Sequence, residues 1–174
     1  RCFSHCKSLS EVTFCAGSQL KRIEKEAFFW SGLTKICIPA SVESIGERCF
    51  YECKSLSEVT FCDGSQLKSI ESNAFKLSGL TKIWIPTSVE SIGGGCFCEC
   101  KSLSEVTFCD GSQLKRIDNH AFRSSGLTKI CIPASVESIG EKCFCQCKSL
   151  SEVTFCDGSQ VKKIDNDMFS YSVL

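Results

Sequence analysis

The sequence repeats itself with a period of 47 residues. A Cys-Phe pair recurs at residues 2, 49, 96 and 143, and nearly the same string of residues follows each pair. Repeats of this length stack into solenoids, because one unit cannot bury its own apolar face without a neighbour. The repeat therefore predicts one solenoid over residues 1–174. Since the chain begins and ends inside a repeat, we expect it to be a piece of a longer array.

Each unit divides into two related halves, one strand in each. The first half reads L-x-x-V-x-F and the second L-x-x-I-x-I-P, with leading leucines that alternate at steps of 24 and 23 residues. Apolar and polar residues alternate around V-T-F and I-C-I, which is typical of a half-buried strand. Steps of about 20–29 residues are typical of leucine-rich repeats. We expect seven strands paired in parallel in a single sheet. The leading leucines are Leu9, Leu33, Leu56, Leu80, Leu103, Leu127 and Leu150.

A phenylalanine recurs at the same corner of every predicted turn. These residues are Phe3, Phe28, Phe50, Phe75, Phe97, Phe122, Phe144 and Phe169. Phe buries a large apolar area, so we expect a continuous aromatic spine along the solenoid. The segments around this corner, such as residues 71–77, are expected to form short helical turns on the outer face.

The full pattern resembles a known repeat family. It reads L-x-x-I-x-I-P-x-x-V-x-x-I-G-x-x-x-F-x-x-C-x-x-L and is carried by residues 38–46 together with Phe50, Cys53 and Leu56. It resembles the BspA-like leucine-rich repeats of bacterial and protist surface proteins, and the S-L-S-E-V-T-F half is similar to the trichomonad members. The resemblance implies an α/β fold, a curved right-handed solenoid with a parallel sheet on its concave face and short helical turns on its convex face. It also implies adhesion or recognition at a cell surface, and it supplies no catalytic residues.

Charge narrows the classes of partner. The chain has 20 basic and 20 acidic residues and a formal net charge of zero. A nucleic-acid binder or an anionic-membrane binder would show a basic excess. No run approaches the roughly 18 apolar residues that a membrane span needs. We therefore expect no nucleic acid and no membrane insertion in this segment, and instead a protein or glycan partner beside the neighbouring repeats of the parent chain.

Two columns of side chains should point outward from the concave sheet. The first column is Glu11, Lys35, Glu58, Lys82, Glu105, Lys129 and Glu152. Adjacent strands lie about 4.8 Å apart, so each carboxylate should lie between two ammonium groups. This ladder is interpreted either as a solubilising surface that neutralises itself or as a polar strip that positions a partner.

The second outward column breaks its own pattern once. It reads Thr13, Cys37, Thr60, Trp84, Thr107, Cys131 and Thr154. An exposed Trp in a recessed face is a candidate interaction hot spot. The alternative is drift of the repeat, with the indole lying over Lys82 or Thr60. The candidate binding residues are Glu58, Thr60, Cys62, Lys82, Trp84, Glu105, Thr107 and Lys129.

The 16 cysteines fall into columns of the repeat. Cys2, Cys49, Cys96 and Cys143 alternate with Ala and are expected to be small buried residues. Cys6, Cys53, Cys100 and Cys147 are expected to cap or pack against the backbone inside the turn. Cys15, Cys62, Cys109 and Cys156 follow a strand at the edge of the concave face.

Disulfides and metal sites are judged from these columns. A column recurs every second turn, roughly 9–10 Å apart, whereas bridged Cα atoms lie within about 7 Å. The edge cysteines have Cys37 and Cys131 as diagonal neighbours, a separation that is marginal for a bridge. The C-x-C-x-C runs at residues 96–100 and 143–147 are spaced too closely for a usual zinc site. We expect no metal, and exposed thiols at Cys98 and Cys145.

The pattern favours a binding protein over an enzyme. Every candidate Ser is a repeat position, so no asymmetric catalytic arrangement is predicted, and no cofactor is expected. The leading hypothesis is a non-catalytic binding or adhesion module of a cell-surface or secreted protein. The alternative is an intracellular structural repeat protein within a larger cytoplasmic assembly, which fits many unpaired cysteines and the absence of an N-glycosylation sequon.

Overall fold

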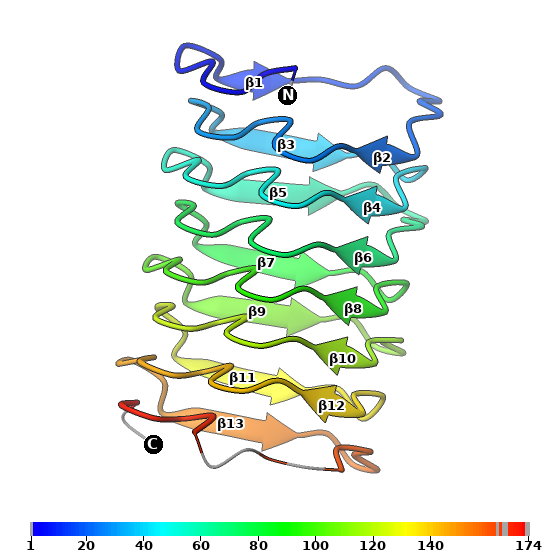
Figure 1. Ribbon diagram of the computed structural model, residues 1–174. Coiled ribbons are helices and arrows are strands. Elements are labelled where there is room, and N and C mark those ends of the chain that lie inside the picture. The colour runs from blue at the N-terminus through cyan, green and yellow to red at the C-terminus, as the bar shows by residue number, and fades with distance from the viewer. Residues whose placement is uncertain (1, 163, 165–166, 173–174) are drawn as a thin grey trace.

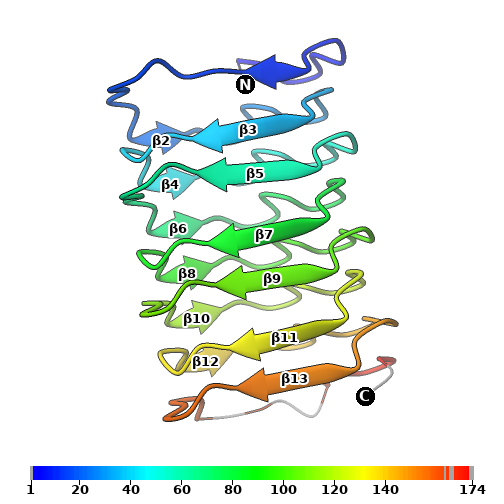
Figure 2. The same cartoon turned by 180° about the vertical axis from the view of Figure 1, so that it is seen from behind.

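The chain winds into successive turns that stack on one another. The computed structural model describes residues 2–162, 164 and 167–172. Successive turns place strands on two opposite faces of the stack, four residues long on one face except in the first turn, and two residues long on the other (Figures 1 and 2). Arg1 and Leu174, the first and last residues of the chain, lie outside the described residues.

Seven strands form what we call the long-strand face, and all of them except the first are four residues long. They are β1 (Glu11–Val12), β3 (Lys35–Ile38), β5 (Glu58–Phe61), β7 (Lys82–Ile85), β9 (Glu105–Phe108), β11 (Lys129–Ile132) and β13 (Glu152–Phe155). All of their pairings are parallel, so the predicted strands are confirmed in the described part of the chain. Pro39, Pro86 and Pro133 directly follow β3, β7 and β11, as expected where a ladder must stop.

The long-strand face is not one continuous sheet. Its strands form the sheets β1-β3-β5 and β7-β9-β11-β13, and the described residues show no ladder between β5 and β7. Strands 23 residues apart pair over four residues, as in β3 with β5 and β7 with β9. Strands 24 residues apart pair less: β9 and β11 share only the Glu105–Lys129 pair. The alternating step therefore groups the strands two by two.

A second parallel sheet covers the opposite side, which we call the short-strand face. Its strands are β2 (Arg22–Ile23), β4 (Ser44–Ile45), β6 (Ser69–Ile70), β8 (Ser91–Ile92), β10 (Arg116–Ile117) and β12 (Ser138–Ile139). This sheet was not expected from the sequence. Its mark in the sequence is a polar residue followed by a buried Ile at the same place in each turn.

The prediction of short helical turns on the outer face is wrong, because the described residues contain no helix. Residues 71–77 show the reason. The backbone N–H of Phe75 donates to the carbonyl of Cys96 in the next turn, at 2.9 Å, rather than to a carbonyl four residues earlier. Asn73 and Leu77 have φ of 57° and 61°, in the left-handed region that interrupts a right-handed helix. The corner is therefore a series of tight turns bonded to its neighbours.

Strands on both faces also explain the shape of the stack. Parallel strands lie about 4.8 Å apart, so both faces rise by the same amount with each turn. A layer of helices about 10 Å wide would hold the turns farther apart on one side and bend the stack. Figures 1 and 2 show a column without a marked bend, and we therefore speak of a long-strand face rather than a concave one.

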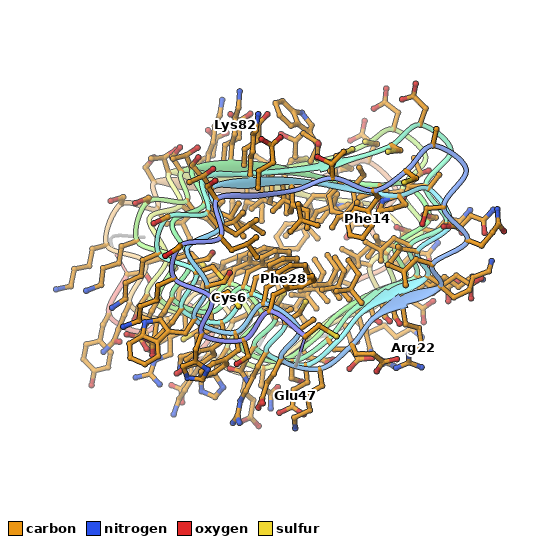
Figure 3. The ribbon with its side chains drawn as sticks, turned by 90° about the horizontal axis from the view of Figure 1, so that it is seen from above. Cys6, Phe14, Arg22, Phe28, Glu47 and Lys82 are labelled. Atoms are coloured by element: carbon orange, nitrogen blue, oxygen red, sulfur yellow. The ribbon has the colours of Figure 1, made fainter. Side chains whose placement is uncertain are left out.

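The predicted aromatic spine is confirmed. Neighbouring corner rings from Phe3 to Phe169 stack with centroids 5.1–5.7 Å apart and planes within 13° of parallel. Five central rings are fully buried: Phe50, Phe75, Phe97, Phe122 and Phe144. Figure 3, a view along the column, shows Phe28 between the two faces. The spine thus joins the turns into one continuous core.

Candidate functional site

The outward column of charges lies on the long-strand face in the register that the sequence predicts. Lys35 is opposite Glu11 on one side and Glu58 on the other. Figure 3 shows Lys82 projecting away from the interior. The Lys35 ammonium lies 3.3 Å from the Glu11 carboxylate. Among the described residues, no other rung of this ladder has opposite charges within 4.0 Å.

Charges beside the short-strand face are paired more closely. Lys21 donates to Glu43 at 2.8 Å, and Lys25 donates to Glu47 at 2.7 Å. These hydrogen bonds lower the pKa of both glutamates. The short-strand face thus neutralises much of its own charge, whereas most charges in the outward column of the long-strand face have no ion pair within 4.0 Å among the described residues.

Trp84 is the exposed aromatic residue in the middle of the long-strand face. Its side chain is 47% exposed, and the Lys82 ammonium lies 4.7 Å from the indole centroid. Exposed cation–π contacts of this kind contribute about 0.5–1 kcal/mol, so the lysine helps to fix the ring in place. A hollow of about 350 Å³ lies beside the indole, where β5 and β7 do not pair, and Thr60 and Cys62 also line it.

Two larger grooves flank this central hollow. One, of about 620 Å³, is lined by β9, β11 and β13, and the other, of about 500 Å³, by β1, β3 and β5. Their lining residues are equivalent and lie two repeats apart, as Glu105 and Glu11 do. Sequence reasoning missed these grooves, each of which spans one 24-residue step and one 23-residue step between strands. Trp84 occupies the position that Cys37 and Cys131 occupy in them.

The structure distributes the predicted binding residues over these hollows, with each side chain exposed or partly exposed. The eight residues divide by location. Thr60, Cys62 and Trp84 surround the central hollow, Glu58 and Lys82 lie with Trp84 around a smaller one of about 240 Å³, and Glu105, Thr107 and Lys129 line the groove of about 620 Å³. They belong to, or directly follow, the strands β5, β7, β9 and β11.

Two pairs of exposed thiols lie at the edge of the same face. The sulfur atoms of Cys37 and Cys62 are 3.2 Å apart, and those of Cys131 and Cys156 are 3.0 Å apart. Hydrogen bonding within each pair raises the pKa of Cys62 and of Cys156. The sequence identified these diagonal neighbours and predicted a separation that is marginal for a bridge, and the structure brings the sulfur atoms of each pair into contact.

The thiols inside the turns act as structural hydrogen-bonding groups, as predicted. Cys53 donates to the Phe28 carbonyl at 3.0 Å and lies 3.4 Å from the Ser31 hydroxyl. Cys100 and Cys147 repeat this arrangement in later turns. Burial raises the pKa of Cys100 to about 12, so it stays protonated and unreactive at neutral pH.

The prediction of exposed thiols at Cys98 and Cys145 is wrong. These side chains are only 6% and 5% exposed. The same column holds Tyr51, Lys76 and Arg123 in neighbouring turns. Since adjacent turns are close, the larger neighbours cover the small thiols. Cys49, Cys96 and Cys143 are fully buried, as predicted, whereas Cys2 in the first turn is exposed.

The residues that the structure describes contain neither a cluster of metal-ligating side chains nor a membrane-spanning helix. No group of three or more His, Cys, Asp or Glu side chains there could hold a metal ion. In the same residues, no helix is long and apolar enough to cross a bilayer.

Comparison with protein families agrees with the repeat and with the stacked turns. Six copies of the BspA type leucine rich repeat region match the chain, over residues 1–78 and 68–174. The chain belongs to this family. A search of curated protein sequences found no match.

Solved structures similar to this BspA-type chain include bacterial surface proteins. The pneumococcal vaccine antigen PcpA is 35% identical with a TM-score of 0.71, over 72% of this chain and 31% of its own. A leucine-rich cell surface protein of Faecalibacterium prausnitzii is 30% identical with a TM-score of 0.57, over 87% of this chain and 47% of its own. A leucine-rich repeat protein of Eubacterium ventriosum, 23% identical with a TM-score of 0.55, over 87% of this chain and 43% of its own, supports the fold alone. The chain thus spans less than half the length of these proteins.

Proposed function

We propose that this chain is a non-catalytic binding module of a surface or secreted protein, which engages a protein or glycan through its long-strand face. The observation that carries the proposal is Trp84, an indole 47% exposed at the centre of that face and beside a hollow. Trp is enriched among the residues that dominate binding energy, because it offers a large rigid surface.

The surroundings of Trp84 support a binding role. Lys82 packs over one part of the ring, and Glu58, Thr60 and Thr107 supply polar groups nearby. A central aromatic anchor with a polar rim is the usual arrangement of an interaction site. The mixed charge of the ladder favours a partner that presents both hydrogen-bond donors and acceptors rather than a strongly charged polymer.

The proposed location at a cell surface is supported by relatives. One similar structure is described as a vaccine antigen and another as a cell surface protein. Labelling of intact cells with a reagent that does not cross membranes would test the location. Modification of the parent protein in intact cells is expected, and modification only after lysis would favour the alternative of an internal assembly.

The binding proposal is tested by comparing two tryptophans. Trp30 is a matched control, since it is 40% exposed and carries Lys7 4.4 Å above its ring, but it lies in the turn between β2 and β3. The purified chain, Trp84→Ala and Trp30→Ala would be screened against a glycan array and a panel of extracellular matrix proteins. For every ligand found, Trp84→Ala should lose roughly thirtyfold or more in affinity, as expected for a hot spot worth about 2 kcal/mol.

Two results would contradict a binding site at Trp84. Retained binding by Trp84→Ala together with loss in Trp30→Ala would place the site at the corner turns and overturn the proposal. A Trp30→Phe variant leaves Trp84 as the only tryptophan. Its fluorescence should shift when a ligand is added, and an unchanged spectrum at saturation would also contradict contact with Trp84.

A further inference from the structure

Two equivalent thiol pairs join consecutive turns at the edge of the long-strand face. Cys37 belongs to β3 and Cys62 follows β5, while Cys131 belongs to β11 and Cys156 follows β13. All four residues are exposed, and the sulfur separations are 3.2 and 3.0 Å. The arrangement is thus built twice, two repeats apart.

We propose that Cys37–Cys62 and Cys131–Cys156 are sites of cross-strand disulfide formation by exchange with a small-molecule disulfide. The bond length in a disulfide is about 2.05 Å, so each pair of sulfurs needs to approach by only about 1 Å. Unbonded carbon atoms in contact lie about 3.5–4.0 Å apart. The thiols are already closer than that, although sulfur is the larger atom.

The backbone holds each pair in this position. The N–H of Cys62 donates to the Ile38 carbonyl at 3.0 Å, which fixes the end of β5 beside the end of β3. The equivalent bond from Cys156 to the Ile132 carbonyl is 2.9 Å. Both pairs lie where strands pair over four residues. Each second cysteine leads into a turn, whose backbone can adjust more easily than a strand.

The central turn shows why the pairing is selective. Cys109 holds the position equivalent to Cys62 and Cys156, but its diagonal neighbour is Trp84 instead of a cysteine. Cys109 is exposed, so it serves as an internal control for thiol exposure without a partner. Burial prevents a disulfide reagent from reaching the cysteines of the core, and it also disfavours their charged thiolate form.

The exchange proceeds in two balanced steps. One thiol of a pair loses its proton, and the thiolate attacks a sulfur of oxidised glutathione, releasing one glutathione thiolate and leaving a mixed disulfide. The other thiol of the pair, as thiolate, then attacks the protein sulfur of that mixed disulfide and releases the second glutathione thiolate. Each pair loses two electrons and two protons, and one oxidised glutathione becomes two thiols. Since the thiolate is the nucleophile and the internal hydrogen bond raises the pKa of Cys62, the rate should increase with pH.

The chain itself is sufficient for the test, and the bond needs no binding partner. Reduced protein would be equilibrated with glutathione buffers of increasing oxidation, quenched with acid, unfolded and alkylated. Two protein disulfides should form and consume four of the 16 thiols. An exposed cysteine without a partner, such as Cys109, can go no further than the mixed disulfide with glutathione, which mass spectrometry distinguishes from a protein disulfide. Peptide mapping should find Cys37 joined to Cys62 and Cys131 joined to Cys156, with Cys109 either alkylated or carrying glutathione.

Variants make the assignment specific. Cys62→Ser should abolish one bond and leave the other, with circular dichroism checking that the solenoid is intact. Trp84→Cys should create a third bond, with Cys109. Sixteen free thiols in strongly oxidising buffer, or bonds among other cysteines, would overturn the proposal. A Trp84→Cys protein in which Cys109 stays free while the outer pairs close would show that proximity in this turn is not sufficient, and would refute the geometric argument.

Discussion

Removing one ring from the middle of the aromatic spine should destabilise the whole column. Phe97 is fully buried and stacks between Phe75 at 5.4 Å and Phe122 at 5.3 Å. Phe97→Ala leaves a cavity and ends both stacking contacts, at a cost of about 3–5 kcal/mol. Folded proteins are stable by only about 5–15 kcal/mol, so this is a large share of the total.

Urea unfolding followed by circular dichroism and by tryptophan fluorescence would measure the loss. Phe97→Leu keeps an apolar side chain in place and should cost less, and Phe61→Ala, at a partly buried strand end, provides a second comparison. Repeat arrays are stabilised by contacts between neighbours, so loss of the central ring should also separate the unfolding of the two halves. If Phe97→Ala costs no more than Phe61→Ala, the spine does not carry the stability that its burial indicates.

Two further perturbations examine the close contacts between turns and the charges of the short-strand face. Gly79→Ala should cost more than about 3 kcal/mol of unfolding free energy, because the added Cβ would overlap the backbone carbonyl of Lys54. Gly64→Ala should cost only about 1 kcal/mol, because Gly64 has a φ of 73° but no atom near the added Cβ. Equal losses in chemical denaturation would contradict the steric explanation. Since the hydrogen bond from Lys25 lowers the pKa of Glu47, its stabilising effect should be present above the pKa of an unfolded glutamate and lost as the pH falls through the lowered value. Lys25→Gln should therefore be less stable than the parent chain near neutral pH, and the two unfolding free energies should converge in acid. A difference that is constant at all pH values would contradict a stabilising contribution from the Lys25–Glu47 pair.

The burial of the core could be predicted from the sequence because it is encoded as columns. Ile83 and Ile85 alternate with exposed residues in a strand period, and Phe50 recurs with the turn. Both signals depend only on spacing, and both are confirmed by full burial of these residues. The identity of the family could be inferred for the same reason.

The outer layer could not be predicted in this way, because it depends on backbone conformation. Residues as different as Glu26, Asn73 and His120 adopt φ of 57–60° at equivalent corners. Ordinary side chains carry no mark of such a conformation, whereas the short apolar segment around Phe75 suggested a helix. The deciding interaction is a hydrogen bond to the next turn, which depends on how closely the turns stack.

The candidate site was predictable at one residue and not in its surroundings. Trp84 stood out because it interrupts a column of Thr and Cys. The grooves on either side lie over strands that pair to different extents, and steps of 24 and 23 residues do not reveal those extents by themselves. The prediction that Cys98 is exposed failed for a similar reason, since its burial is set by Lys76 and Arg123 in other turns.

Residue 84 connects the two proposals and allows them to be separated. A repeat array presents nearly the same surface in every turn, so a unique binding position requires a departure from the repeat. At residues 37 and 131 the column carries a cysteine whose sulfur lies within 3.2 Å of a second cysteine, and at residue 84 it carries an indole. Trp84→Cys should therefore lose ligand binding as Trp84→Ala does, while gaining a disulfide with Cys109. Loss of ligand binding without the new disulfide would support the indole as the anchor and reject the geometric account of the thiols. Formation of the new disulfide with ligand binding retained would support the geometric account and reject the indole as the anchor.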